Sequence, residues 1–194
     1  MPLEIILASA SPRRRELLSL ITTRFSVVAS DFDEASISSD LAPDEHVISS
    51  AASKAWDVGG NHPGALVIGA DTIVVVDGTI LGKPADPQDA ARMLRLLSGR
   101  SHSVYTGLAV VLGEEERTGC KRTEVAFREM SDQMITRYVS PGEPLDKAGA
   151  YAIQGKGAVL IKGICGCYSN VVGLPLHLLS GMLEEFGVEV LEQA

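Results

Sequence analysis

Four groups of residues in this chain of 194 amino acids combine chemically active side chains with turn-forming neighbours. In the first group, three consecutive arginines, Arg13–Arg15, follow Ser11 and Pro12, where the sequence predicts the start of a helix. Each cation in a first helical turn opposes the helix dipole by up to about 1 kcal/mol. This placement favours an anion site in which guanidinium groups, backbone N–H groups and the hydroxyls of Ser9 and Ser11 hold a phosphate. A solvated basic surface remains the alternative.

The second group surrounds Asp71. The run Leu66–Val76 is otherwise apolar and rich in β-branched residues, which is typical of a central strand buried on both faces. An ionised carboxylate there is costly unless it is paired, hydrogen-bonded or bound to metal. Gly69 indicates a bulge or close backbone approach, and Thr72 adds a hydroxyl. Asp71 is therefore a candidate functional carboxylate, and a structural Asp satisfied by backbone donors is the alternative.

The other two groups are loops. Lys83 lies between Gly82 and Pro84, so a stiff loop would aim its amine, although surface loops often carry lysine. The stretch Asp146–Gly155 is rich in small residues that permit close ligand approach, and the amide of Gln154 can pair with a base edge. An ordinary glycine-rich connection explains this stretch equally well. Together the four groups indicate an anionic, phosphate-bearing ligand without naming a reaction.

The composition limits the size of that ligand. The chain carries 25 acidic residues against 17 lysines and arginines, a formal net charge of -8. This balance argues against a protein that coats nucleic acid or anionic membrane through bulk charge. No stretch approaches the roughly 20 apolar residues that span a bilayer, and the N-terminus lacks the charge pattern of a secretion signal. We therefore expect a cytoplasmic protein that binds a small polyanion, with no nucleic-acid or membrane partner.

The elements that must position these groups alternate between strands and helices. A chain of this length buries roughly 70% of its unfolded surface, so one core suffices. Periodicity and turn residues predict strands over 3–8, 25–29, 66–76, 80–81, 103–112, 118–128, 158–164 and 168–172. They predict helices over 12–20, 43–57, 86–97, 131–139 and 175–186. The hairpin over 103–128 and the mixed order indicate an α/β or α+β domain around a mixed sheet. Cys165 and Cys167 are expected to be buried strand thiols.

The sequence resembles the Maf family over nearly its whole length, from Ile5 to about Phe186. The resemblance lies in successive motifs that follow the family's order at compatible spacing. These motifs are Leu7–Arg14, Gly69–Thr72, Leu81–Pro84, Leu97–Arg100, Asp146–Gln154 and Val172–Pro175.

This resemblance implies both a fold and an activity. The implied fold is α/β, a single domain over residues 1–194 with a central mixed, strongly twisted sheet flanked by helices, similar to the inosine-triphosphate pyrophosphatases. The implied activity is that of a nucleoside-triphosphate pyrophosphatase. Such an enzyme cuts between the α- and β-phosphates, releases a nucleoside monophosphate and pyrophosphate, and needs a divalent cation, Mg²⁺ or Mn²⁺.

The resemblance also assigns roles to residues. Asp71 matches the family's proposed proton acceptor. Glu34 matches an acidic position that would help Asp71 hold the metal, although the adjacent Asp33 could exchange roles with it. The residues that would bind phosphates are Arg13, Arg14, Lys54 and Lys83, with Ser9 beside them.

Three further positions distinguish branches of the family. Arg13, Thr72 and Gln154 agree with the branch that acts on dTTP and UTP, whereas the branch acting on 7-methyl-GTP usually has an aromatic residue, Gln and Glu there. An amide both donates and accepts hydrogen bonds, as a uracil or thymine edge requires, whereas a carboxylate only accepts. The resemblance therefore implies dTTP and UTP as substrates, with modified pyrimidine nucleotides and 7-methyl-GTP left open.

A function of another class stays open as well. The family is associated with inhibition of septum formation, and a non-catalytic regulator of cell division could sense nucleotides with the same pocket. A retained carboxylate beside a full basic set favours catalysis. The family also suggests a homodimer, although no apolar stripe in the sequence identifies its interface.

Overall fold

The computed structural model describes residues 3–191, and the strands among them form one seven-stranded mixed sheet. Its order is β2-β1-β3-β5-β6-β7, with β4 paired to β3. β1 is parallel to β2 and β3, whereas β3 is antiparallel to β4 and β6 to β7. The strands are β1 (Ile5–Ala8), β2 (Ser26–Val27), β3 (Leu66–Val76), β4 (Thr79–Leu81), β5 (Ser101–Leu112), β6 (Glu115–Phe127) and β7 (Ile161–Cys165).

The helices flank this sheet, so the predicted α/β class is confirmed. Several of them begin as the sequence predicts: α1, α2 and α3 each have proline in the first turn. The helices are α1 (Pro12–Leu18), α2 (Pro43–Gly59), α3 (Pro87–Leu97), α4 (Asp132–Val139), α5 (Tyr168–Val172) and α6 (Leu176–Glu185), with short 3₁₀ helices η1 (Glu34–Ser36), η2 (Ala148–Ala150) and η3 (Gly155–Leu160).

The chain forms two compact units. The first unit comprises the residues up to Asp71, Thr106–Lys121 and the residues from Gly173 on. The second unit comprises Thr72–Tyr105 and Arg122–Val172. Strands β3, β5 and β6 each continue from one unit into the other, so the units are joined through strands.

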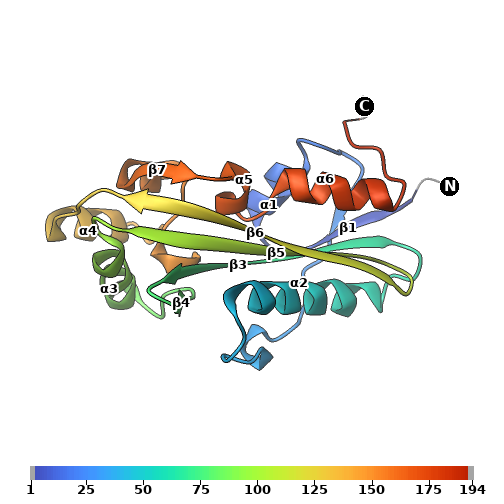
Figure 1. The fold of residues 1–194 in the computed structure, drawn as a ribbon, viewed down its shortest axis with the longest axis horizontal. Coiled ribbons are helices and arrows are strands. Elements are labelled where there is room, and N and C mark those ends of the chain that lie inside the picture. Colours follow the sequence, from blue (N-terminus) through green and yellow to red (C-terminus); the bar gives the residue numbers. More distant parts are fainter. Residues whose placement is uncertain (1–2, 192–194) are drawn as a thin grey trace. The chain divides into compact units, whose positions relative to one another are not determined.

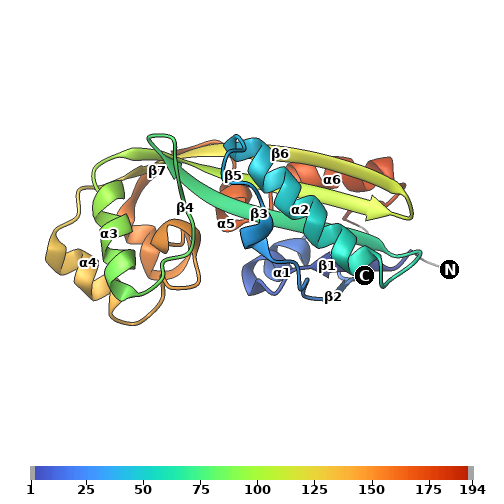
Figure 2. The same ribbon diagram turned by 90° about the horizontal axis from the view of Figure 1, so that it is seen from below.

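In the first unit, α2 covers one face of the sheet and α6 covers the other (Figures 1 and 2). Two glycines let α2 approach closely. A Cβ on Gly69 of β3 would lie 2.1 Å from the Ala51 carbonyl oxygen, and one on Gly107 of β5 would lie 2.3 Å from the Val47 carbonyl oxygen. The close approach that Gly69 predicted is therefore confirmed. The apolar core between α2 and the sheet consists of Ile6, Ala8, Ala51, Ala55, Val58, Ala65, Val67, Ala109 and Val111.

The second unit has its own core. Helices α3 and α4 pack against each other, and their apolar faces meet residues of β3, β5 and β6. Three buried rings pack edge-to-face with one another. The distance between ring centroids is 4.9 Å for His102 and Phe127, 5.3 Å for His102 and Tyr151, and 4.7 Å for Phe127 and Tyr151. Such pairs stabilise a core beyond the area that they bury.

The predicted strands near the C-terminus need two corrections. Tyr168–Val172 is the helix α5, and β7 begins only at Ile161 because Gly155–Leu160 forms the 3₁₀ helix η3. Asn170 and Val172 are buried and alternate with less buried residues, which mimics the period of a strand. In a five-residue segment the hydrophobic period therefore did not distinguish helix from strand.

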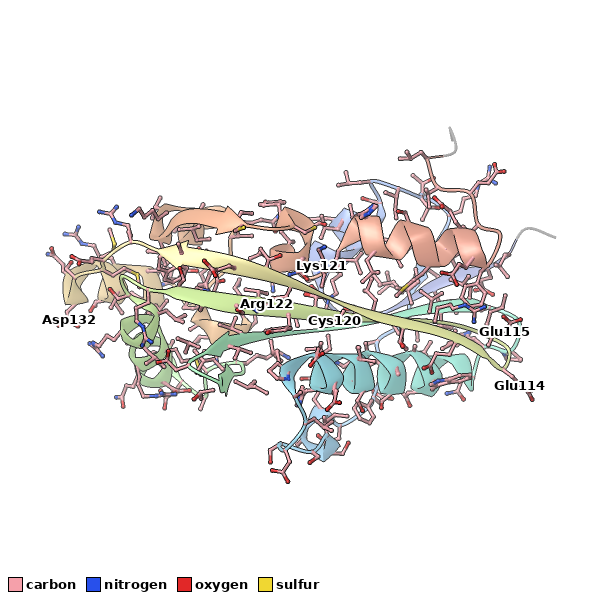
Figure 3. All side chains as sticks on the ribbon, viewed as in Figure 1. Glu114, Glu115, Cys120, Lys121, Arg122 and Asp132 are labelled. Atoms are coloured by element: carbon pink, nitrogen blue, oxygen red, sulfur yellow. The ribbon has the colours of Figure 1, made fainter. Side chains whose placement is uncertain are left out.

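The prediction of buried strand thiols is wrong. Cys165 is exposed at the end of β7, an edge strand of the sheet, and Cys167 is half-buried outside the strand. Figure 3 labels Cys120 on β6, with Glu114 and Glu115 at the turn that joins β5 to β6.

Within residues 3–191, no helix is long and apolar enough to cross a membrane.

Candidate active site

Lys54 joins the two predicted metal-binding carboxylates of the first unit. Its Nζ lies 2.7 Å from Asp71 Oδ1 and 2.8 Å from Glu34 Oε1. Lys54 is 7% exposed and Asp71 is 8% exposed, whereas the Glu34 side chain is half exposed. A buried carboxylate needs a partner of opposite charge, and Lys54 supplies it. The cost of placing Asp71 in an apolar strand is thereby offset.

The elements explain how these charges meet. Lys54 lies on α2, one turn beyond Ala51, and Ala51 contacts β3 at Gly69. Asp71 follows Gly69 by two residues, and side chains two apart point to the same face of a strand. The closeness that Gly69 permits therefore brings the ammonium of Lys54 to Asp71.

In the acidic loop before α2, the adjacent carboxylates Asp33 and Glu34 have different partners. Asp33 is the N-cap of η1, and its Oδ1 accepts a hydrogen bond from Ala35 N–H at 3.0 Å. Glu34, the first residue of η1, pairs with Lys54. Of these two adjacent carboxylates, Asp33 therefore caps η1 and Glu34 faces Lys54.

Arg14 is held in place by two oxygen acceptors. Its Nε donates to the Gly173 carbonyl at 2.8 Å, and its Nη1 donates to Ser9 Oγ at 3.3 Å. Ser9 and Ser11 form the turn between β1 and α1, where Ser11 N–H donates to Ser9 Oγ at 3.2 Å. The turn that starts α1 therefore also orients the guanidinium.

The charges around Arg14 show that it shares the site with the carboxylates. Burial lowers the pKa of Arg14, the charges of Asp71 and Glu34 oppose that shift, and the charge of Arg13 adds to it. Arg13 is partly buried beside Arg14 in the first turn of α1. Two arginines and a lysine thus meet two carboxylates in a small volume, which suits an anion bound together with a cation.

The donor set of this site fits a magnesium-type cation. Glu34 and Asp71 each direct an oxygen at one point, the Lys54 ammonium, within 2.8 Å. Among the residues that the structure describes, no group of three or more His, Cys, Asp or Glu could hold a metal ion. Mg²⁺ is typically bound by one or two carboxylates together with substrate phosphates. Glu34 and Asp71 are the two carboxylates that the protein would contribute to such a site.

The second unit contains the loops of Lys83 and Gln154 and ties them together. Gly149 N–H, in the loop before Gln154, donates to the carbonyl of Gly82 at 3.0 Å. A Cβ on Gly149 would lie 2.8 Å from Val74 Cγ2, and Gly149 has φ +68. Only glycine combines this backbone conformation with this contact. Lys83 itself is exposed, and Gln154 is partly buried.

Two buried tyrosines hold the segment that carries Gln154. Tyr151 Oη lies 2.7 Å from His102 Nε2, and Tyr138 Oη accepts a hydrogen bond from Ala152 N–H at 3.3 Å. Ala150, the residue before Tyr151, is fully buried and has φ +61, a conformation that costs a non-glycine residue free energy. The segment is therefore fixed from both sides into a backbone shape that it would not adopt alone.

The structure gathers most of the predicted site residues. The first unit brings together Ser9, Arg13, Arg14, Glu34, Lys54 and Asp71. The second unit contains Thr72, Lys83 and Gln154, and Thr72 directly follows Asp71 along β3.

Sequence reasoning missed the groups that orient the site. These are the Gly173 carbonyl on Arg14 and the pair of His102 and Tyr151 beneath the Gln154 segment. Gly173 falls in the motif Val172–Pro175, but a backbone carbonyl leaves no signal in residue type.

Comparison of the amino-acid sequence with known proteins shows to which family the chain belongs. The family model described as Maf-like protein matches residues 4–186. The chain is 52% identical over 187 residues to the dTTP/UTP pyrophosphatase of Symbiobacterium thermophilum, covering 96% of each chain. It is 50% identical over 190 residues to the dTTP/UTP pyrophosphatase of Pelotomaculum thermopropionicum, covering 97% of this chain and 99% of the other.

Among solved structures, the Staphylococcus aureus Ham1 protein shares the fold. It has a TM-score of 0.56 at 14% sequence identity, over 94% of this chain and 99% of that one. The expected likeness in fold is therefore confirmed. The family model and the identity to full-length relatives go further: the chain belongs to the Maf family.

Proposed function

We propose that this protein is a nucleoside-triphosphate pyrophosphatase that hydrolyses the α–β phosphoanhydride of dTTP and UTP, giving the nucleoside monophosphate and pyrophosphate. The observation that carries the proposal is the cluster in which the buried Lys54 bridges the buried Asp71 and the half-exposed Glu34 beside Arg14. Relatives at 52% and 50% identity that bear the name dTTP/UTP pyrophosphatase support the same substrates.

The cationic residues bind the triphosphate. Arg14 is oriented by Gly173 and Ser9, so little side-chain entropy is lost when its guanidinium group meets phosphate oxygens. Arg13 and Lys83 add positive charge toward the β- and γ-phosphates. Charge neutralisation by preorganised donors is the main source of catalysis in phosphoryl transfer, because the leaving pyrophosphate gains negative charge as the bond breaks.

Asp71 accepts the proton of the attacking water. A divalent cation, when bound, would neutralise phosphate charge and make water easier to deprotonate, and Glu34 and Asp71 are the residues that would hold it. Water adds its oxygen to the α-phosphorus, the bond from that phosphorus to the bridging oxygen breaks, and pyrophosphate leaves. One water is consumed for each monophosphate and pyrophosphate formed.

Base selection belongs to Gln154, with Thr72 and Arg13 as supporting positions. The Gln154 amide offers one donor and one acceptor group, which matches the edge of uracil or thymine. Because Tyr138 and Tyr151 fix the segment around Gln154, the amide lies on a backbone that is rigid before the nucleotide binds.

The proposal is tested by screening canonical and modified nucleoside triphosphates with Mg²⁺ or Mn²⁺ and following pyrophosphate. We expect UTP and dTTP to give UMP and dTMP with pyrophosphate, and no orthophosphate. In water labelled with heavy oxygen, the label should appear in the monophosphate, since attack occurs at the α-phosphorus. Nucleotide binding without turnover would instead identify a non-catalytic sensor, and a preference for 7-methyl-GTP would place the chain in the other branch.

The role of Asp71 has its own test with a matched control. Asp71→Asn should lower kcat by about 10²- to 10⁴-fold, the usual contribution of a general base. Asp77→Asn makes the same chemical change at an exposed turn residue, where φ is +49, and should leave turnover unchanged. Near-normal turnover by folded Asp71→Asn would refute the role of Asp71.

A further inference from the structure

Asp57, an exposed residue of α2 that the proposed function does not use, binds the loop that leads to Glu34. Its Oδ2 accepts a hydrogen bond from Ser30 Oγ at 2.7 Å and another from Asp31 N–H at 2.9 Å. Ser30 Oγ accepts in turn from Phe32 N–H at 3.0 Å, which closes a local turn. One carboxylate of α2 therefore holds the backbone of the loop three residues before Glu34.

The loop meets α2 a second time at Lys54. Lys54 Nζ lies 2.8 Å from Glu34 Oε1, and Lys54 precedes Asp57 by three residues. Residues three apart in a helix share one face and are about 4.5 Å apart along its axis. The loop therefore follows one face of α2, with its backbone bound at Asp57 and the Glu34 carboxylate bound at Lys54.

The chain between these two contacts is shaped by Asp33. Its Oδ1 accepts from Ala35 N–H at 3.0 Å, and its carbonyl accepts from Ser36 N–H at 3.0 Å. These bonds belong to the short helix η1, which begins at Glu34. A helix of one turn is not stable by itself, so its position is set by the contacts that hold it. The place from which the Glu34 side chain extends therefore depends on the bonds that Asp57 makes with the preceding residues.

We infer that Asp57 is a positioning residue for Glu34: it holds the loop against α2 so that the Glu34 carboxylate meets Lys54. A group that is held in place before its ligand arrives loses less conformational freedom on binding. The effect on metal binding rests on the proposed function, because it assumes that Glu34 and Asp71 hold a divalent cation. The placement of Glu34 at Lys54 does not depend on that assumption.

Two substitutions at Asp57 separate hydrogen bonding from charge. Asp57→Asn removes the negative charge, but an amide oxygen has two lone pairs and can accept both bonds. Asp57→Ala removes the same charge and the acceptor as well. Asp44→Ala is the control for charge, because it removes another exposed carboxylate from α2, thirteen residues away in the first turn. Both positions are exposed, so each variant should fold.

The first measurement is the NMR signal of the Lys54 ammonium in metal-free protein, assigned by its loss in Lys54→Met. In the unaltered protein, in Asp57→Asn and in Asp44→Ala, its two ion pairs should slow proton exchange with water. In Asp57→Ala we expect exchange about two- to five-fold faster, as for the loss of one ion pair. An unchanged exchange rate in Asp57→Ala overturns the inference.

The second measurement is a calorimetric titration with Mn²⁺ alone. Asp57→Ala should weaken Mn²⁺ binding by about three- to ten-fold, the usual effect of a lost hydrogen bond. Asp57→Asn and Asp44→Ala should bind Mn²⁺ as the unaltered protein does. In a Glu34→Gln background, Asp57→Ala should have almost no further effect, because the residue acts through Glu34. Equal losses in Asp57→Ala and Asp57→Asn, or in both backgrounds, overturn the inference.

Failure of the proposed function gives a different result from failure of this inference. An unaltered protein that binds no Mn²⁺ and hydrolyses no nucleoside triphosphate would refute the proposed metal site. The exchange rate of the Lys54 ammonium then decides by itself whether Asp57 positions Glu34.

Discussion

The ammonium nitrogen of Lys54 lies 2.7 Å from Asp71 Oδ1, and both residues are buried. The same nitrogen is 2.8 Å from Glu34 Oε1, so a protein cation occupies the point on which both carboxylates converge. A divalent metal that used these carboxylates would have to displace this ammonium. Triphosphate oxygens offer it a new partner, so metal and nucleotide binding should assist each other through Lys54.

This competition predicts the behaviour of Lys54→Met. Without nucleotide, Mn²⁺ should bind Lys54→Met at least about ten-fold more tightly than the unaltered protein, because a nearby positive charge is removed. The gain in Mn²⁺ affinity that nucleotide gives the unaltered protein should shrink in the variant, since coupling between ligands is reciprocal. Calorimetric titration of Mn²⁺ with and without a non-hydrolysable UTP analogue measures both effects. Lys121→Met, an exposed change in the same unit, is the control. Weaker Mn²⁺ binding by Lys54→Met would contradict the competition between Lys54 and the metal.

Base selection predicts a change of preference in Gln154→Glu. The carboxylate loses the donor that a pyrimidine carbonyl needs, so kcat/KM for UTP and dTTP should fall by about 10- to 100-fold, the usual effect of one lost hydrogen-bonding group. Guanine nucleotides, whose edge donates, should be less affected. Steady-state kinetics with UTP, dTTP and 7-methyl-GTP decide the point. An equal loss for all three substrates would mean that Gln154 has no part in base selection.

The close packing of α2 on β5 predicts that Gly107→Ala is strongly destabilising. The added Cβ would lie 2.3 Å from the Val47 carbonyl oxygen, so the helix must move, at a cost of at least about 3 kcal/mol. Gly181→Ala on α6 is the matched control: nothing lies within 4 Å of its Cβ. That change should stabilise the protein by about 0.5–1 kcal/mol, since alanine is the better helix former. Urea unfolding compares the two, and a tolerated Gly107→Ala would show that α2 can shift freely.

Asp71 and the arginines of the first helix were predictable because each breaks a local rule. Asp71 interrupts an apolar strand, and three arginines occupy a first helical turn, so residue type alone marks them. Lys54 carries no such mark and lies on an ordinary helix. Its position came from the family resemblance, and its two ion pairs came only from the structure.

The parts that sequence did not predict depend on backbone atoms and on contacts distant in sequence. Gly173 orients Arg14 with a carbonyl, which every residue possesses. α5, which was predicted as a strand, is bound through Asn170 to Thr123, more than forty residues earlier in the chain. Ala150 adopts a positive φ that residue type disfavours. In each case tertiary contacts, and not local preference, set the conformation.

Buried His102 predicts a specific acid sensitivity of folding. Burial lowers the pKa of His102 to about 4, against an ordinary value of 6.5. The unfolded chain therefore binds the proton first as pH falls below about 6.5, and stability declines until about pH 4, by up to about 3 kcal/mol. Urea unfolding of the unaltered protein and His102→Gln over this range should show a stability difference that shrinks with falling pH. A stability difference between His102→Gln and the unaltered protein that stayed constant over this pH range would exclude the linkage.

The two units carry separate fluorophores, which allows a test of whether residues 1–194 fold as the single domain that we propose. Trp56, the one tryptophan, lies in the first unit, and the tyrosines Tyr105, Tyr138, Tyr151 and Tyr168 lie in the second. Because β3, β5 and β6 run through both units, neither can lose its strands without disrupting those of the other. Tryptophan and tyrosine signals should therefore change at the same urea concentration.

A core substitution in one unit makes this test sharper. Leu94, on α3 of the second unit, is fully buried, so Leu94→Ala should cost about 2–5 kcal/mol. In a single cooperative domain that loss must reach the Trp56 signal undiminished, because the free energy of unfolding belongs to the whole chain. Urea curves followed by both fluorophores should then shift together. A Trp56 midpoint that stayed in place while the tyrosine midpoint fell would show that the units unfold independently, even though they share strands.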